Sequence, residues 1–256
     1  MTQINDNALK YYKCGNDYYL EMSKGNVPGH STQFMVGINE DLGTSEETCW
    51  DQGGTYTFLT ADTELFVSST DSGDTGITIL CIGLDANWDR KTAIVTTDAT
   101  DAQTQESIGN WIRFETAVIV GSTEPTGDLY FAPSDTVSGG VPDTTADIKG
   151  KMIAGNNSTR NGFFTVPAGH TAYLLAVSAN TGRGNDARYT GKVRLDGGVF
   201  WRRNQFSSYE NEVFINSLVR TGLAEKTDVE FVAEAAGTMN IAEAQVQYIL
   251  VDNNFI

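Results

Sequence analysis

The sequence predicts an all-β protein with two tandem antiparallel β-sandwich or jelly-roll-like domains behind an extended N-terminal arm. Short runs rich in β-branched and aromatic residues recur along the 256 residues, and clusters of Gly, Asp, Asn, Ser and Thr separate them. No long segment has a helical period. The formal net charge is −16, and the acid excess ends where the strand pattern is interrupted.

Strand candidates are apolar or alternating runs bounded by turn residues. In the first part they lie at Glu64–Ser69, Ile77–Leu84, Lys91–Thr97, Trp111–Val120 and Asp128–Ala132. In the second part they lie at Lys151–Ala154, Phe163–Val166, Ala172–Asn180, Arg188–Leu195, Val199–Phe206, Val229–Ala235 and Glu243–Val251. Short helices are alternatives to loops at Ala99–Ile108 and Asn211–Leu218.

Two joints have a specific turn chemistry. Asp196-Gly197 lies between two strand candidates, and this dipeptide favours a tight type I′ hairpin because both residues tolerate positive φ. Asp85-Ala86-Asn87 also links two strand candidates, and Asn readily adopts the left-handed conformation that such turns need. Both joints therefore predict hairpins.

A boundary between two domains is predicted near residue 145. The stretch from Gly121 to Ala146 contains three prolines and Ser138-Gly139-Gly140, which is typical of a linker. Residues 1–145 contain 6 Lys+Arg and 22 Asp+Glu, whereas residues 146–256 contain 11 of each. We therefore expect an arm at 1–33, an acidic sandwich at 34–145 and a charge-neutral sandwich at 146–256.

The predicted arm, residues 1–33, has neither strand alternation nor a helical period. It contains four tyrosines, including Tyr18 and Tyr19, and then the stretch from Gly25 to Ser31. Such a segment cannot bury itself, so we expect it to pack on its own domain or on a partner. The expected contacts are Tyr18, Tyr19, Val27, Pro28 and His30.

Composition argues against two classes of partner. A nucleic-acid binder needs surplus Lys and Arg to neutralise phosphates, and this chain has a deficit. A membrane span needs about 20 apolar residues, and the longest apolar run is only Ile77–Leu84. The N-terminus is polar without a signal-like apolar region, so we expect synthesis in the cytoplasm, with no export by the usual route.

Motifs for catalysis, metals and cofactors are weak. Asp85–Asp89 matches the start of a calcium loop, but the glycine and the final glutamate are missing; a loosely held calcium between acidic turns stays an alternative. Gly182–Ala187 fits a dinucleotide pattern, but a strand follows where a helix is required. No serine-nucleophile elbow, phosphate loop or zinc-protease helix is present. We therefore expect no enzyme, cofactor or metal.

Basic and aromatic residues alternate in the second part. Trp201 is followed by Arg202 and Arg203, and the run continues to Phe206. This pattern fits either an interface for an acidic surface or a solvated strand whose aromatic residues point inward. We expect the neutral second domain to contact neighbouring subunits, and the acidic first domain to face solvent because its copies repel one another.

Several short motifs, in order along the chain, resemble one protein family. They cover roughly residues 20–253: Gly25–Ser31, Trp50–Tyr56, Gly83–Trp88, Phe164–Leu174, Gly197–Phe200, Glu225–Val229 and Leu250–Asn253. In this order they resemble virion structural proteins of tailed bacteriophages. The resemblance implies a non-enzymatic role in a particle made in a bacterial host, as a capsid decoration, a head fibre or a tail-associated protein.

The resemblance implies other virion proteins as partners and a homo-oligomer, with a trimer favoured. The main alternative is a tail-associated module that binds a host-surface glycan. Aromatic residues beside acidic loops, such as Trp50-Asp51 and Tyr130-Phe131, fit that alternative if they are exposed. A depolymerising enzyme with paired carboxylates is the second alternative, although no pair stands out.

Overall fold

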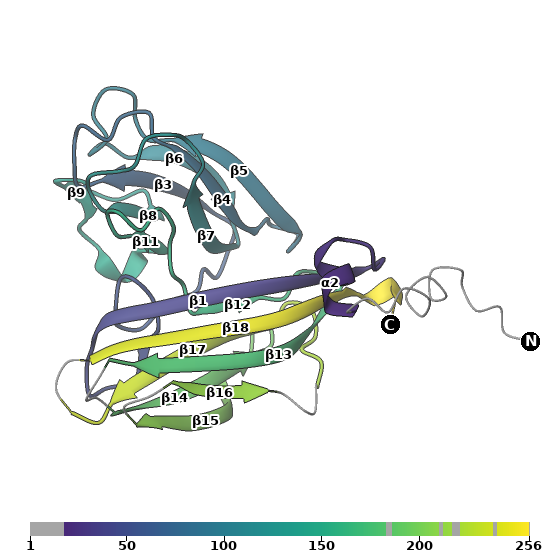
Figure 1. Cartoon of the computed structure of the whole chain (residues 1–256). Coiled ribbons are helices and arrows are strands. Elements are labelled where there is room, and N and C mark those ends of the chain that lie inside the picture. Colours follow the sequence, from purple (N-terminus) through teal and green to yellow (C-terminus); the bar gives the residue numbers. More distant parts are fainter. Residues whose placement is uncertain (1–17, 183–185, 210–211, 217–220, 238–239, 256) are drawn as a thin grey trace, which may run out of the picture.

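The protein is all-β in the computed structural model, which describes residues 18–182, 186–209, 212–216, 221–237 and 240–255 (Figure 1). The sheets are antiparallel, and helix is confined to short segments. The predicted fold class is thus confirmed at the level of an all-β chain. Its division into two tandem sandwich or jelly-roll-like domains stays a prediction.

The lower sheets in Figure 1 contain strands from both ends of the described chain. One has the order β1-β18-β13-β16, with bounds His30–Leu42, Asn240–Asp252, His170–Thr181 and Val213–Asn216. The other has the order β12-β17-β14-β15, with bounds Phe163–Thr165, Asp228–Ala235, Asp186–Arg194 and Trp201–Tyr209. The short strand β2, Glu47–Thr48, also pairs with β17.

The upper sheets lie between these strands in sequence. One has the order β11-β8-β3-β6, with bounds Gly150–Met152, Leu129–Pro133, Thr63–Ser69 and Glu106–Trp111. The other has the order β5-β4-β7, with bounds Arg90–Thr96, Thr78–Leu84 and Arg113–Ile119. The remaining elements are short: α2 (Tyr18–Ser23), β9 (Val137–Ser138), β10 (Val141–Pro142) and 3-10 turns at Thr145–Asp147 and Asn253–Phe255.

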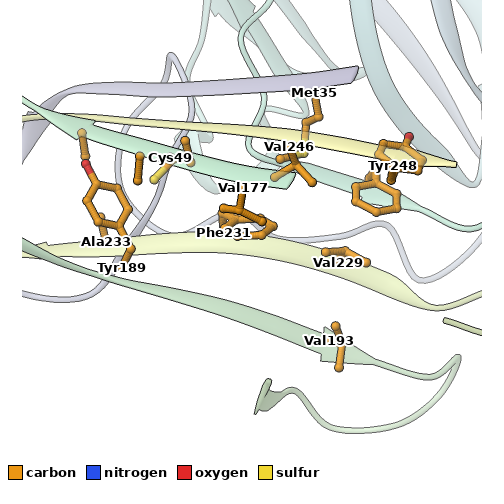
Figure 2. Packing of buried hydrophobic residues seen from close by; sticks show 14 of the residues in the cluster. Met35, Cys49, Val177, Tyr189, Val193, Val229, Phe231, Ala233, Val246 and Tyr248 are labelled. Carbon is orange, nitrogen blue, oxygen red and sulfur yellow. The ribbon is translucent and has the colours of Figure 1, made fainter. Parts of the chain in front are cut away.

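Each pair of sheets has its own hydrophobic core. Side chains such as Val246, Phe231 and Tyr189 fill the lower core, and Figure 2 shows them between the facing strands. The upper core contains Trp111 and Phe131, both fully buried. Burial of such large apolar side chains stabilises each core by roughly 1.5–3 kcal/mol per side chain.

Strand pairing does not follow the predicted sequence boundaries. β1 begins inside the predicted arm, continues into the predicted acidic domain, and pairs with β18 from His30↔Val251 to Leu42↔Asn240. β11 lies beyond residue 145 but pairs with β8 in the upper sheets. The chain thus enters the lower sheets, leaves for the upper sheets and returns. The three-part division of the sequence stays a prediction.

Local structure refines three expectations. Asp85 accepts hydrogen bonds from the N–H groups of Asn87 and Asp89, which confirms the predicted hairpin turn between β4 and β5, but the left-handed residue is Trp88 and not the expected Asn87. Asp196-Gly197 does not form a type I′ turn, because only Gly197 has positive φ; the Gly198 N–H bonds the Leu195 carbonyl as in a type II turn. Neither suggested helix forms in the described residues, where β6 begins at Glu106 and β16 spans Val213–Asn216.

Candidate functional site

The short helix α2 presents aromatic side chains at one end of the lower sheets. Tyr18 and Tyr19 are 45% and 38% exposed, and their rings meet edge-on at 6.2 Å. Tyr18 also meets the His30 ring at 6.5 Å. The helix ends because Gly25 adopts positive φ and its N–H bonds the Met22 carbonyl. The structure therefore brings together three of the predicted arm contacts.

Val27 and Pro28, the other predicted arm contacts, lie in different environments. Val27 is buried with Met22 against Ile249 and Val251, on the outer face of the sheet that β18 forms. Pro28 is exposed, and its carbonyl oxygen lies 2.9 Å from the His30 Nδ1. Val27 therefore anchors the segment on its own chain, whereas Tyr18 and Tyr19 are partly exposed.

A groove of about 530 Å³ lies beside α2, between the helix and the outer face of the lower sheets. Tyr19 and Ser23 line it from the helix side, and Phe34 and Phe214 line it from β1 and β16. Phe34 and Phe214 are 57% and 61% exposed. Exposed large apolar side chains that gather around one groove are typical of an interaction surface.

The predicted contacts on β15 are split between surface and core. Trp201 is 52% exposed, and the exposed Arg202 side chain lies 3.5 Å from Glu46. Arg203 donates a hydrogen bond to the Thr221 carbonyl. Phe206 instead packs on the lower core, where its ring stacks on Tyr189. The interpretation of this run as an interface therefore fits the exposed Trp201 and Arg202, and the interpretation with aromatic residues pointing inward fits Phe206.

A second groove, of about 430 Å³, lies where the upper and lower sheets meet. Gln33 and Phe34 of β1 line both grooves. Glu115 lines the inner end, where its carboxylate accepts the Thr165 N–H at 2.9 Å. Burial raises the pKa of Glu115, and the nearby Arg90 partly opposes that rise.

Arg160 lines the second groove and connects it to β1 and to the loop after β2. It donates to Glu40 and to Asp51, and the Asp51 side chain is fully buried. Burial raises the pKa of Asp51 to about 6 against the opposing effect of Arg160. The contact is an ion pair within the chain, which positions the loop against β1.

The aromatic residues considered for glycan binding are not available to a ligand. Trp50, Tyr130 and Phe131 are 3%, 7% and 0% exposed. Trp50 and Tyr130 belong to an aromatic cluster with Tyr56, Phe58 and Phe163, and Phe131 belongs to the upper core. The condition on which these residues would fit the glycan-binding alternative, exposure beside acidic loops, is therefore not met, because they fill the interior.

Several exposed apolar residues were not identified from the sequence. Phe34, Ile94 and Phe214 are each more than half exposed, although all three lie in strands. Leu195 and Val199 are 58% and 84% exposed at the β14–β15 turn. The only sequence signal was strand alternation, which does not show which of its two faces the fold leaves open.

Neither a cluster of metal ligands nor a membrane-spanning helix is present among the described residues. No group of three or more His, Cys, Asp or Glu side chains lies close enough there to hold a metal ion. In the same ranges, no helix has both the length and the apolar character to cross a lipid bilayer.

Comparison with known proteins gives little similarity. No family model matches the sequence, and no curated protein matches it. The structure of the Gx strain of infectious bursal disease virus is 11% identical, with 89% of this chain and 73% of that chain covered and a TM-score of 0.23. The VP2 subviral particle of the same virus is 10% identical over the same shares, with a TM-score of 0.21. Scores this low support no conclusion about fold or function.

Proposed function

We propose that this chain is a non-enzymatic structural component of a tailed-phage virion, made in the bacterial host cytoplasm. It joins the particle as a homo-oligomer, with a trimer favoured, as a capsid decoration, head fibre or tail-associated protein. The order of the short motifs between residues 20 and 253 supports the assignment to a phage particle. The single observation that supports assembly through the N-terminal region is the exposed aromatic group of α2 beside a groove lined by Phe34 and Phe214.

The proposed contact is burial of Tyr18 and Tyr19 against another virion protein. Tyrosine suits this role because its ring supplies apolar area at small cost in conformational entropy, and its hydroxyl can bond at the wet rim. Met22 and Val27 hold the segment on β18, so the tyrosines are presented from a fixed base. Trp201 and Arg202 form a second, smaller candidate contact.

Particle incorporation tests this function. A tagged copy of the chain would be expressed in the bacterial cells in which the phage particles assemble. The particles would then be purified and analysed by quantitative mass spectrometry. We expect the wild-type copy in particles, and at least about tenfold less of a Tyr18→Ser/Tyr19→Ser double variant, since lost aromatic hot spots cost about 2 kcal/mol or more. Ile241→Ser, another exposed position, is the matched control.

Two outcomes would contradict the proposal in different ways. Absence of the wild-type chain from purified particles would reject the virion role. Normal incorporation of the double variant would reject the arm contact alone. Point variants are preferable to removing residues 1–31, because that deletion would also remove Met22 and Val27 from their packing on β18.

A further inference from the structure

The helix α2 covers only one end of the outer face of the sheet β1-β18-β13-β16. Ile249 of β18 points to this face, because its neighbours Tyr248 and Leu250 point into the lower core. Ile249 is nevertheless only 7% exposed, since Met22 and Val27 pack on it. Figure 1 shows α2 beside one end of these strands. Cover from α2 therefore ends part of the way along the face.

Two further rows of side chains on this face lie beside α2. One row contains Phe34, Gln247 and Ala176, which are paired across β1, β18 and β13. The next row reaches Phe214 on β16 through its pairing with Ser178 on β13. Phe34 and Phe214 are 57% and 61% exposed, and both line the groove of about 530 Å³. The end of the face under α2 is thus filled, whereas these two rows expose large apolar side chains.

The groove over these two rows is uncharged. None of its ten described lining residues carries a charge, although the formal net charge of the chain is −16. Gln33 and Gln247 provide amide groups beside the aromatic and aliphatic side chains. An occupant therefore needs apolar side chains with hydrogen-bonding groups next to them, because a buried charge would lose its hydration there without gaining a partner.

Residues 1–17 of this chain have that composition, and they end beside the groove. They precede Tyr18, the first residue of α2, and Tyr19 already lines the groove. Leu9, Tyr11 and Tyr12 supply apolar side chains and two hydroxyl groups. The segment contains two Lys and two Asp, so its side-chain charges cancel, whereas residues 1–145 contain 22 Asp+Glu against 6 Lys+Arg. The six residues from Tyr12 to Tyr18 extend to at most about 20 Å, which is enough to reach the groove.

We propose that Leu9–Tyr12, from the chain's own N-terminal segment, pack in this groove over Phe34 and Phe214. The two tyrosine rings and the leucine cover the apolar floor, and the tyrosine hydroxyls bond the glutamine amides of the groove. Lys10 keeps its ammonium group in water at the open side, while its stem packs along apolar surface. The inference concerns the free chain and does not rest on the proposed function.

The size of the two rows favours a tethered segment over a separate protein. Two rows across four strands cover roughly 260 Å² at ordinary strand spacing and rise. A stable interface between separate proteins needs about 800 Å² from each partner. A segment joined directly to α2 needs no such area, because a short tether holds it at an effective concentration on the order of millimolar. Weak contacts are therefore enough for the chain to cover its own groove.

A native thiol makes this contact testable in the full chain. Cys14 belongs to the segment, and the other two cysteines, Cys49 and Cys81, are fully buried. Gln247→Cys places a second thiol in the groove, and Ile241→Cys places one on the same strand and face, about 20 Å away. A short bis-maleimide would link the two thiols, and gel electrophoresis with peptide mass spectrometry would measure the rate. Circular dichroism would verify that both variants fold.

We expect linking within one chain to be at least about tenfold faster for Gln247→Cys than for Ile241→Cys, because docking raises the local concentration of Cys14 at the groove alone. Tyr11→Ser and Tyr12→Ser, added to Gln247→Cys, should reduce its rate to that of the control, since the apolar contact is lost while the reach is kept. Equal rates at the two positions would overturn the proposal, and so would links that form only between two chains. A segment without its two tyrosines that links as fast as the native one would overturn it as well.

Discussion

Arg113 on β7 and Asp228 on β17 form a buried bidentate ion pair that joins the upper sheets to the lower sheets. Arg113 Nε donates to Asp228 Oδ1 at 2.7 Å, and Nη2 donates to Oδ2 at 2.9 Å. Asp228 is fully buried and also accepts hydrogen bonds from Arg194 and Thr165. A single carboxylate therefore accepts hydrogen bonds from two guanidinium groups at the junction.

Replacement of this carboxylate should be strongly destabilising. In Asp228→Asn, two arginines lose their counter-charge in a buried site, and we expect a loss of about 3–5 kcal/mol in the free energy of unfolding. Urea denaturation measures it. Glu234→Gln is the matched control, because it breaks an exposed pair with Arg188, and we expect a loss below about 1 kcal/mol. Similar losses in both variants would contradict a structural role for the junction.

Gly37 of β1 should not tolerate a side chain. A Cβ atom there would overlap backbone atoms of Cys49 and Gly162, and backbone cannot move aside as a flexible side chain can. We expect Gly37→Ala to cost about 1–3 kcal/mol by overpacking. Gly237→Ala, which has open space around it, should change stability by less than about 0.5 kcal/mol. Thermal unfolding of both variants measures the difference, and equal midpoints would refute the close approach.

Asp51 should couple stability to pH. Its pKa is raised to about 6 by burial, against about 3.9 in the unfolded chain. The folded state thus binds the proton more tightly, so this contribution is complete below about pH 4 and is lost as pH rises through about 6. Relative to Asp51→Asn, the wild type should gain on the order of 1–2 kcal/mol between pH 7.5 and 4.5. A constant or opposite difference in urea denaturation would contradict it.

The thiols of Cys49 and Cys81 should be unreactive in the folded protein. Both side chains are fully buried; burial raises the pKa of Cys81 to about 12 and raises that of Cys49 as well. Because the thiolate is the reactive form, we expect neither residue to be alkylated at pH 8 until the chain unfolds. Peptide mass spectrometry reads each position separately. Labelling of either residue in the native protein would disprove its burial.

Many strands and the positions of turns could be predicted from the sequence because both depend on neighbouring residues, whereas the type I′ turn predicted at Asp196-Gly197 was wrong. The predicted run Ile77–Leu84 closely matches β4, and Asp85 forms its hairpin turn as expected. The helix α2 was not predicted, since its six residues are too few to show a helical period and it depends on Met22 packing against Ile249. Local signals therefore identified strands such as β4, but they missed α2 and also β1, which spans the predicted end of the arm and pairs with β18 from the far end of the chain.

The candidate contact surfaces were predicted only in part. Tyr18 and Tyr19 were singled out by composition, and both are exposed. Phe206 and Val27 were also singled out, yet both pack within the chain. The sequence does not distinguish an aromatic or branched side chain that fills a core from one that contacts a partner, because such a side chain is equally hydrophobic in both places.

By itself the sequence determined an acidic, all-β chain whose acid excess lies in residues 1–145. Only the tertiary structure decided that β1 pairs with β18, and that Ile79 and Cys81 face the core while Leu80 and Ile82 face outward. In a continuous apolar run, successive side chains point to opposite faces of the strand, and both faces are equally apolar. Which face points to the core depends on which sheet packs against the strand. Net charge is likewise a sum over a segment, whereas association depends on where each charge lies.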